Sequence, residues 1–129
     1  MSEPFTEQIT FLSTEDLERA TVFYGDTLGL ALVLDQGDCR IFHVGGAAYV
    51  GVCARPGRTR SEGVIVTLVT EDVDGWHARL TAAGVVCDAA PSLHPKYEIY
   101  QAFYRDPDGH VIEIQRFADP NWAGGVSTT

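Results

Sequence analysis

The strongest constraint on the fold is a short stretch that occurs twice. Thr70-Glu71-Asp72 repeats Thr14-Glu15-Asp16 at an offset of 56 residues. In each copy the hydroxyl can cap a helix N-terminus, and the carboxylates lie in the first turn, where negative charge is favoured. The apolar face of each helix follows the same offset, with these pairs: Leu17 and Val73, Ala20 and Trp76, Tyr24 and Leu80. The chain is therefore predicted to fold as two related units.

Strand and turn signals around the two helices give each unit the order βαβββ. The first unit is predicted to have a helix at 14–28 and strands at 8–12, 30–34, 39–44 and 47–53. The second is predicted to have a helix that ends at Gly84, a loop at 89–98, and strands at 64–69, 85–87, 99–105 and from 111 onward. This pattern predicts an α+β fold, a single domain over 1–129 with repeat units at about 6–54 and 63–118 and a C-terminal tail at 119–129.

The last predicted strand carries an unusual charge. Asp106-Pro107-Asp108-Gly109 suits a tight turn, so the strands on either side of it should form a hairpin. After the turn, Val111, Glu113 and Gln115 share one face of the strand. Glu113 is thus a carboxylate within a mostly apolar run, and it is either a rim charge or a ligand.

Composition narrows the classes of partner. The 129 residues are 45% hydrophobic, and 18 acidic against 9 basic residues give a net charge of −9. This charge disfavours nucleic acid and anionic lipid, and no apolar run is long enough to span a membrane, so we expect a soluble, cytoplasmic protein. Cys39, Cys53 and Cys87 are odd in number and widely spaced, which favours small buried hydrophobes over a disulfide framework.

Several of these motifs together resemble a known superfamily. Asp16-Leu17 precedes Phe23-Tyr24 and Leu28-Gly29, and the Asp106–Gly109 turn leads to Glu113. This arrangement resembles the vicinal oxygen chelate superfamily, which includes glyoxalase I, bleomycin-resistance proteins, fosfomycin-resistance enzymes and extradiol dioxygenases. The resemblance covers about residues 8–117. It implies that each unit curls into half of an open barrel with a concave pocket for a small organic molecule, and that two copies form a homodimer.

The resemblance also implies where a divalent metal would be held, on the first and last strands of the units. Gln8 and Glu113 occupy two of those positions, whereas Val64 stands where the family places His, and the last strand of the first unit has no carboxylate. One carboxylate and one amide oxygen leave most of a coordination shell to water. We therefore expect no tightly bound cofactor, with a divalent metal possible. Glu62 is the nearest residue that could supply a further ligand.

Other polar and aromatic side chains are candidate contacts for a ligand, and each has a plainer interpretation. Arg40 could instead form a surface ion pair, His43 could be a half-exposed strand histidine, and the tyrosines could serve packing. His77 and His110 are expected at the surface. The candidate ligand-binding residues are Gln8, Arg40, His43, His94, Tyr100, Gln101, Tyr104 and Gln115.

The sequence leaves two functions open. The first is a glyoxalase or bleomycin-resistance-like protein that binds a small molecule without a tight catalytic metal. The alternative is a glyoxalase-type lyase or isomerase, in which a metal on Gln8 and Glu113 polarises a carbonyl and Glu113 is the catalytic carboxylate that moves a proton. A dioxygenase is less favoured, because its usual set of two histidines and one carboxylate does not occur at these positions.

Overall fold

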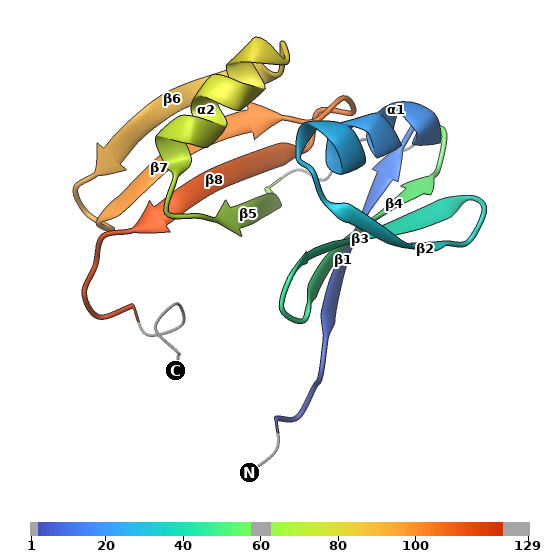
Figure 1. Cartoon of the computed structure of the whole chain (residues 1–129), viewed down its shortest axis with the longest axis horizontal. Helices are drawn as coiled ribbons and strands as arrows, with labels where there is room; N and C mark the ends of the chain where they lie inside the picture. Colours follow the sequence, from blue (N-terminus) through green and yellow to red (C-terminus); the bar gives the residue numbers. More distant parts are fainter. Residues whose placement is uncertain (1–2, 58–62, 123–129) are drawn as a thin grey trace. The chain divides into compact units, whose positions relative to one another are not determined.

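The computed structural model describes residues 3–57 and 63–122, which form two helix-and-sheet units (Figure 1). The first unit comprises 1–64 together with 106–110, and the second comprises 65–105 and 111–129. In the first unit the elements are β1 (Gln8–Thr14), α1 (Leu17–Thr21), the π-helical turn η1 (Val22–Thr27), β2 (Ala31–Asp35), β3 (Cys39–Gly45) and β4 (Ala48–Ala54). In the second they are β5 (Ile65–Val69), α2 (Val73–Ala82), β6 (Val86–His94), β7 (Ile99–Arg105) and β8 (Val111–Phe117).

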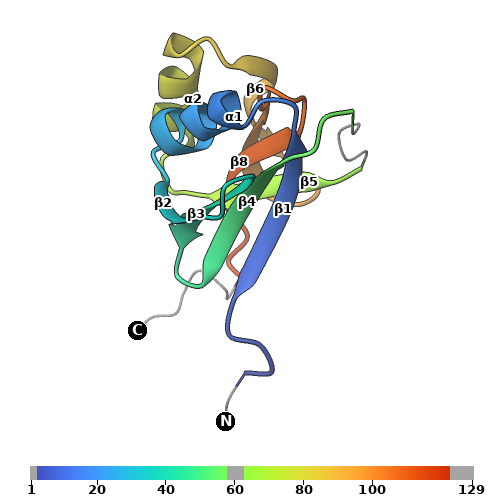
Figure 2. The same ribbon diagram turned by 90° about the vertical axis from the view of Figure 1, so that its right-hand side faces the viewer.

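The two sheets have the same topology. Their strand orders are β1-β4-β3-β2 and β5-β8-β7-β6, and in each sheet the first pair is parallel while the others are antiparallel. Figure 2 shows β1 beside β4 at the parallel edge of the first sheet. The α+β fold with two tandem βαβββ units is thus confirmed. No helix in the described part of the chain is long and apolar enough to cross a membrane.

The repeated tripeptides begin the helices, but the capping atoms differ from those expected. Asp16 and Asp72 are the N-caps, and their carboxylates accept hydrogen bonds from the amides of Arg19 and Gly75 at 3.1 and 2.9 Å. The hydroxyl of Thr14 instead accepts the amide of Asp16. The first helix is also shorter than the predicted 14–28, because after Thr21 it widens into η1, where the Leu28 amide donates to the Phe23 carbonyl.

Strand β6 is longer than the sequence indicated. It extends over Val86–His94, where a strand at 85–87 and a loop at 89–98 were predicted. Pro91 made this stretch look like a loop. β6 lies at the edge of its sheet, and its pairing with β7 shifts register between Ala89 and Ser92, so the missing amide of Pro91 disrupts little.

The turn between β7 and β8 packs within the first unit, on the junction of β1 and α1. Buried Asp106 accepts the Tyr24 hydroxyl at 2.6 Å and the amides of Asp108 and His110 at 2.9 Å each. Asp108 accepts the Thr14 hydroxyl at 2.6 Å. His110 is 4% exposed, and its Nε2 lies 2.8 Å from the Ser13 carbonyl, so the expectation of a surface histidine was wrong.

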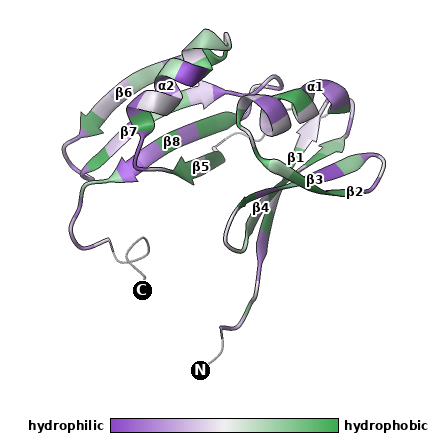
Figure 3. Ribbon diagram, viewed as in Figure 1, coloured by the Kyte–Doolittle hydropathy of each residue, from purple (hydrophilic) through white to green (hydrophobic). Residues whose placement is uncertain are grey.

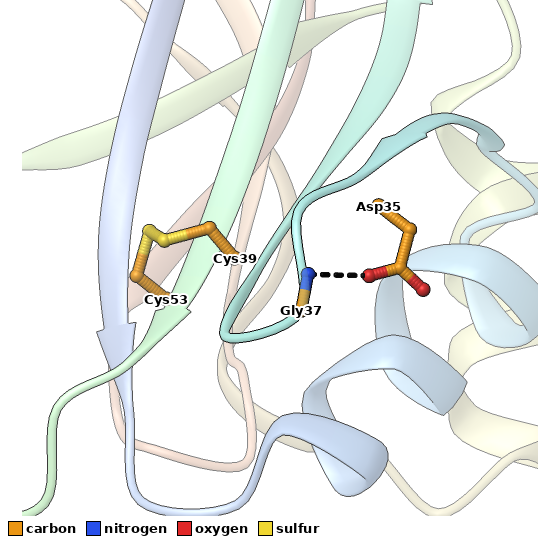
Figure 4. Close-up of a disulfide and its surroundings, with 4 residues drawn as sticks. All are labelled: Asp35, Gly37, Cys39 and Cys53. Atoms are coloured by element: carbon orange, nitrogen blue, oxygen red, sulfur yellow. Dashed lines mark hydrogen bonds between the residues drawn. A yellow bond between two sulfur atoms is a disulfide. The ribbon is translucent and has the colours of Figure 1, made fainter.

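Cys39 and Cys53 form a disulfide between β3 and β4 (Figure 4). The two residues are direct register partners, with Cα atoms 4.0 Å apart. The prediction that favoured small buried hydrophobes over a disulfide was therefore wrong for this pair, although Cys53 is buried. The pairing of β3 with β4 brings Cys39 and Cys53, 14 positions apart, into contact, and the spacing of cysteines along the sequence does not reveal such a contact. Cys87 is free and exposed.

Replacing Tyr24 with Phe should lower the free energy of unfolding by about 1.5–3 kcal/mol, because a buried carboxylate loses a hydroxyl donor. Urea denaturation measures this change. Tyr100→Phe is the matched control, since its hydroxyl donates to Asp74 at an exposed position. Equal losses in the two variants would contradict the structural role assigned to the Tyr24–Asp106 bond.

Replacing both Cys39 and Cys53 with Ser should lower the free energy of unfolding by about 3 kcal/mol, the entropic effect expected for a closed loop of about 15 residues. Urea denaturation of oxidised protein would measure it, and a reductant should reproduce the loss in the parent protein but not in the double variant. Cys87→Ser, the control, should leave the oxidised stability unchanged. A parent protein insensitive to reductant would argue against the disulfide.

Candidate functional site

Polar side chains gather on one face of the second sheet. Glu113 on β8 is flanked in register by Thr67 on β5 and Phe103 on β7. Two residues farther along β8, Gln115 is flanked by Val69 and by Gln101. Side chains alternate along a strand, so these residues share one face, which we call the Glu113 face. The predicted common face of Val111, Glu113 and Gln115 agrees with this register.

The opposite face of the same sheet is covered by α2, which packs on β6, β7 and β8 (Figure 1). Ile112, Ile114, Ala102 and Tyr104 lie on that side and are at most 2% exposed. Hydropathy accordingly alternates along β8, with hydrophilic segments between hydrophobic ones (Figure 3). The apolar half of β8 forms the core under the helix, and its polar half faces away from it.

Glu113 is buried but sparsely bonded. The residue is 8% exposed, and its Oε1 accepts the Thr67 hydroxyl at 2.8 Å. Within the described residues this is its only side-chain hydrogen bond. Gln115 is 5% exposed, and its amide group forms no side-chain hydrogen bond there. Neither residue has a fully buried side-chain atom without a partner, so Glu113 Oε2 and the Gln115 amide keep access to solvent and have capacity for a further hydrogen bond.

The first unit fills the matching position differently. The 56-residue offset relates Thr67 to Phe11, and Phe11 pairs with Gly51 as Thr67 pairs with Glu113. A Cβ on Gly51 would meet the Phe11 ring at about 2.5 Å, so the ring occupies the space where a side chain would start. The first unit thus has an aromatic ring on glycine where the second has a hydroxyl beside a carboxylate.

The residues described do not fit a divalent-metal centre with three or four ligands. Thr67 and Phe103 flank Glu113, and neither is a carboxylate or an imidazole. Across 3–57 and 63–122 no group of three or more His, Cys, Asp or Glu side chains is placed to hold a metal ion. Val64 precedes β5 and is 46% exposed, and Glu62 lies outside the described residues. Glu113 and its described neighbours therefore lack the donor set that a metal-assisted reaction needs.

Three of the predicted ligand-binding residues lie in the first unit. Gln8 is an exposed residue at the start of β1, and alternation places it on the same face as Leu12 rather than that of Phe11. The Arg40 guanidinium contacts Glu18 at 2.9 Å and Asp35 at 3.4 Å, so its partners are local carboxylates. His43 Nε2 lies 2.8 Å from the Gly46 carbonyl.

The other predicted residues lie in the second unit, on two different faces. Gln101 and Gln115 share the Glu113 face. Tyr100 and Tyr104 face the helix: the Tyr100 hydroxyl donates to Asp74 at 2.5 Å, and the Tyr104 hydroxyl lies 2.7 Å from His77 Nδ1. His77 is therefore partly buried and hydrogen-bonded rather than solvent-facing.

His94 ends β6 and contacts the Tyr97 ring in a tilted arrangement, with ring centroids 4.6 Å apart. Its Nδ1 accepts the Tyr97 amide in a long hydrogen bond of 3.4 Å. His94 is thus part of the β6–β7 connection, away from the register positions that flank Glu113.

Comparison with known proteins identifies the family. A family model described as the Glyoxalase/Bleomycin resistance protein/Dioxygenase superfamily matches residues 7–114. The chain belongs to this superfamily. A relative in Bacillus subtilis (strain 168), the uncharacterized protein YraH, is 25% identical, and the match covers 81% of this chain and 93% of the relative.

Solved structures also resemble the chain along most of its length. TioX from Micromonospora sp. ML1 is 25% identical with a TM-score of 0.72, covering 87% of this chain and 98% of its own. A lactoylglutathione lyase from Agrobacterium tumefaciens is 24% identical with a TM-score of 0.69, covering 88% and 96%. The likeness to the lactoylglutathione lyase shows a shared fold only.

The sequence pattern singled out Glu113 as a candidate site residue but not the two residues that flank it, Thr67 and Phe103. Thr67 and Phe103 flank Glu113 only through strand pairing. A signal for Thr67 was present, because it is the only polar residue in the apolar strand Ile65–Val69. Nothing in the sequence alone distinguished Phe103 from the other aromatic residues of β7.

Stability should fall as the pH rises from about 10 to 12, because burial, with a smaller effect of Cys87, raises the pKa of Tyr104 from its ordinary value of 10 to about 12. In that window the unfolded chain releases a proton that the folded chain keeps, which favours unfolding. Urea denaturation across the window should show a smaller fall for Tyr104→Phe. Tyr97→Phe, at a 55% exposed residue, is the control and should behave like the parent. Identical pH profiles for parent and Tyr104→Phe would contradict the prediction.

Proposed function

We propose that this superfamily member is a small-molecule-binding protein that works without a tightly held catalytic metal, and that the Glu113 face contacts the ligand. The homodimer and the cytoplasmic location expected from the sequence belong to the same proposal. The ligand is a small organic molecule with at least one hydrogen-bond donor, since Glu113 offers carboxylate oxygens.

The contrast between two buried carboxylates supports this proposal most directly. Asp106 is 5% exposed and accepts three hydrogen bonds, from the Tyr24 hydroxyl and two backbone amides. Glu113 is almost equally buried but accepts one side-chain hydrogen bond, from Thr67. The second oxygen of Glu113 is not a fully buried atom without a partner, so it is accessible to a ligand that donates a hydrogen bond to it. Asp106 is thus a structural group, and Glu113 has room for a function.

The surroundings of Glu113 suit binding better than nucleophilic or metal-assisted catalysis. Gln101 and Gln115 add amide donors and acceptors, and Phe103 and Val69 add apolar surface on the same face. A few hydrogen-bonding groups among apolar ones are typical of small-molecule sites. The Thr67 hydroxyl donates a hydrogen bond to the Glu113 carboxylate and so orients it, and this hydroxyl does not itself ionise at neutral pH.

Glu113→Gln should weaken ligand binding at least tenfold while the protein stays folded, because the amide loses the charge that strengthens a donated hydrogen bond. Ligands would first be found in a screen of cationic, neutral and anionic small molecules by protein-observed NMR. Binding at this site should shift amide signals in β5, β7 and β8. Glu98→Gln makes the same change at an exposed residue and should leave affinity unchanged.

Metal analysis separates this function from its rival. Elemental analysis of protein purified without chelators should find no stoichiometric transition metal. A stoichiometric metal that disappears in Glu113→Gln would overturn the proposal and establish the metal-assisted lyase or isomerase instead. Equal ligand affinity in Glu113→Gln and the parent would also overturn it.

A further inference from the structure

A pocket lies at the end of β8, where the chain leaves the second sheet. It has a volume of about 300 Å³. Its lining residues come from the ends of β5 and β8 and the segment after β8: Val69, Glu71, Phe117, Ala118, Asp119, Pro120 and Trp122. The superfamily match ends at residue 114, so most of this lining lies beyond the part of the chain shared with the family. We call it the C-terminal pocket.

One wall of the C-terminal pocket is aromatic. Phe117 and Trp122 stack with ring centroids 4.0 Å apart and planes at 16°. Trp122 remains 43% exposed, so the stack does not enclose its indole ring. An accessible indole is the most favourable aromatic surface for a cation.

Backbone hydrogen bonds position this wall. The Ala118 amide donates to the Glu98 carbonyl at 2.8 Å, which holds the chain as it leaves β8. The Trp122 amide then donates to the Asp119 carbonyl at 3.1 Å, and the Asn121 amide donates to the Asp119 carboxylate at 2.8 Å. The segment from 118 to 122 is therefore a formed turn that returns Trp122 to Phe117.

The charged groups of the lining are both acidic. Glu71 and Asp119 each contribute a carboxylate, and the described lining residues include no Lys, Arg or His. In the part of the chain that the structure describes, neither carboxylate forms an ion pair. No basic side chain of residues 3–57 and 63–122 thus neutralises the negative charge of the pocket.

We propose that the C-terminal pocket binds a small organic cation, a protonated amine carried on an apolar group. The two carboxylates attract the ammonium group, and the Trp122 ring and Val69 contact the apolar group. An anion is disfavoured by the carboxylates, and a neutral molecule gains only the apolar contact. Val69 also borders the Glu113 face, but Glu71, Asp119 and Trp122 do not belong to that face, so the cation site goes beyond the function proposed above.

Trp122 provides a direct reporter. The chain has two tryptophans, and Trp76→Phe leaves Trp122 as the only one. In that variant, protonated benzylamine should change the Trp122 fluorescence saturably at neutral pH and low salt. Benzyl alcohol, its neutral counterpart, should bind at least tenfold more weakly, and benzoate should not bind. Higher salt should weaken the benzylamine response, since it screens exposed charges.

Two sets of variants test the location. Glu71→Gln combined with Asp119→Asn should weaken benzylamine binding at least tenfold, and circular dichroism would establish that the variant is folded. Isothermal titration calorimetry with Trp122→Leu provides a second measurement, in which binding should also be at least tenfold weaker. Glu113→Gln should leave the benzylamine response unchanged, which separates this pocket from the Glu113 face.

Several results would overturn the proposal. Equal binding of benzylamine and benzyl alcohol would show an apolar cavity without selection for charge. Unchanged affinity in the folded double variant would remove the carboxylates from the site. Loss of the response in Glu113→Gln would place benzylamine on the Glu113 face, and absence of any saturable response would mean that Phe117 and Trp122 only pack the end of the chain.

Discussion

The hydrogen bond between Tyr24 and Asp106 supports the arrangement from which the candidate site is built. Asp106 also accepts the amides of Asp108 and His110, so one carboxylate sets the shape of the turn from 106 to 110. That turn fixes the register of β7 and β8, in which Arg105 pairs with Val111. A slip of one residue would exchange the two faces of β8 and turn Glu113 toward the helix. The position of Glu113 therefore depends on a turn that precedes it by several residues.

The two units use one topology for different purposes. In the first, the Phe11 ring lies on Gly51, which leaves no space for a side chain at the position that corresponds to Glu113. In the second, Thr67 and Glu113 place a hydroxyl beside a carboxylate. The first unit instead carries the disulfide of β3 and β4 and the polar contacts of the 106–110 turn. The first unit thus carries the disulfide and the bonded Asp106 carboxylate, and the second carries Glu113 with a single side-chain hydrogen bond among the described residues.

Patterns among residues close in sequence predicted the features that depend only on interactions between such residues. Helix caps, turn residues and side-chain alternation gave the βαβββ order, the hairpin after Arg105 and the face of Glu113. Features that depend on strand pairing were not predictable in this way. The Cys39–Cys53 bond, the Thr67 neighbour of Glu113 and the burial of His110 all require partners distant in sequence. Pro91 contributed to the wrong prediction of a loop for a related reason. A strand accommodates proline at the edge of a sheet, and the edge position of β6 depends on strand pairing.

Removing the Glu113 carboxylate from water costs free energy, so packing alone does not explain a glutamate at this position. An apolar residue among Phe103 and Val69 would complete that surface without desolvating a charge, and Asp106 shows how this chain satisfies a carboxylate that serves structure alone. Departures from locally favourable choices are expected where a protein binds or reacts. Glu113 departs in this way, with one hydroxyl donor and an adjacent, unbonded Gln115 amide among the described residues. Under the proposed function, the ligand uses this remaining hydrogen-bonding capacity.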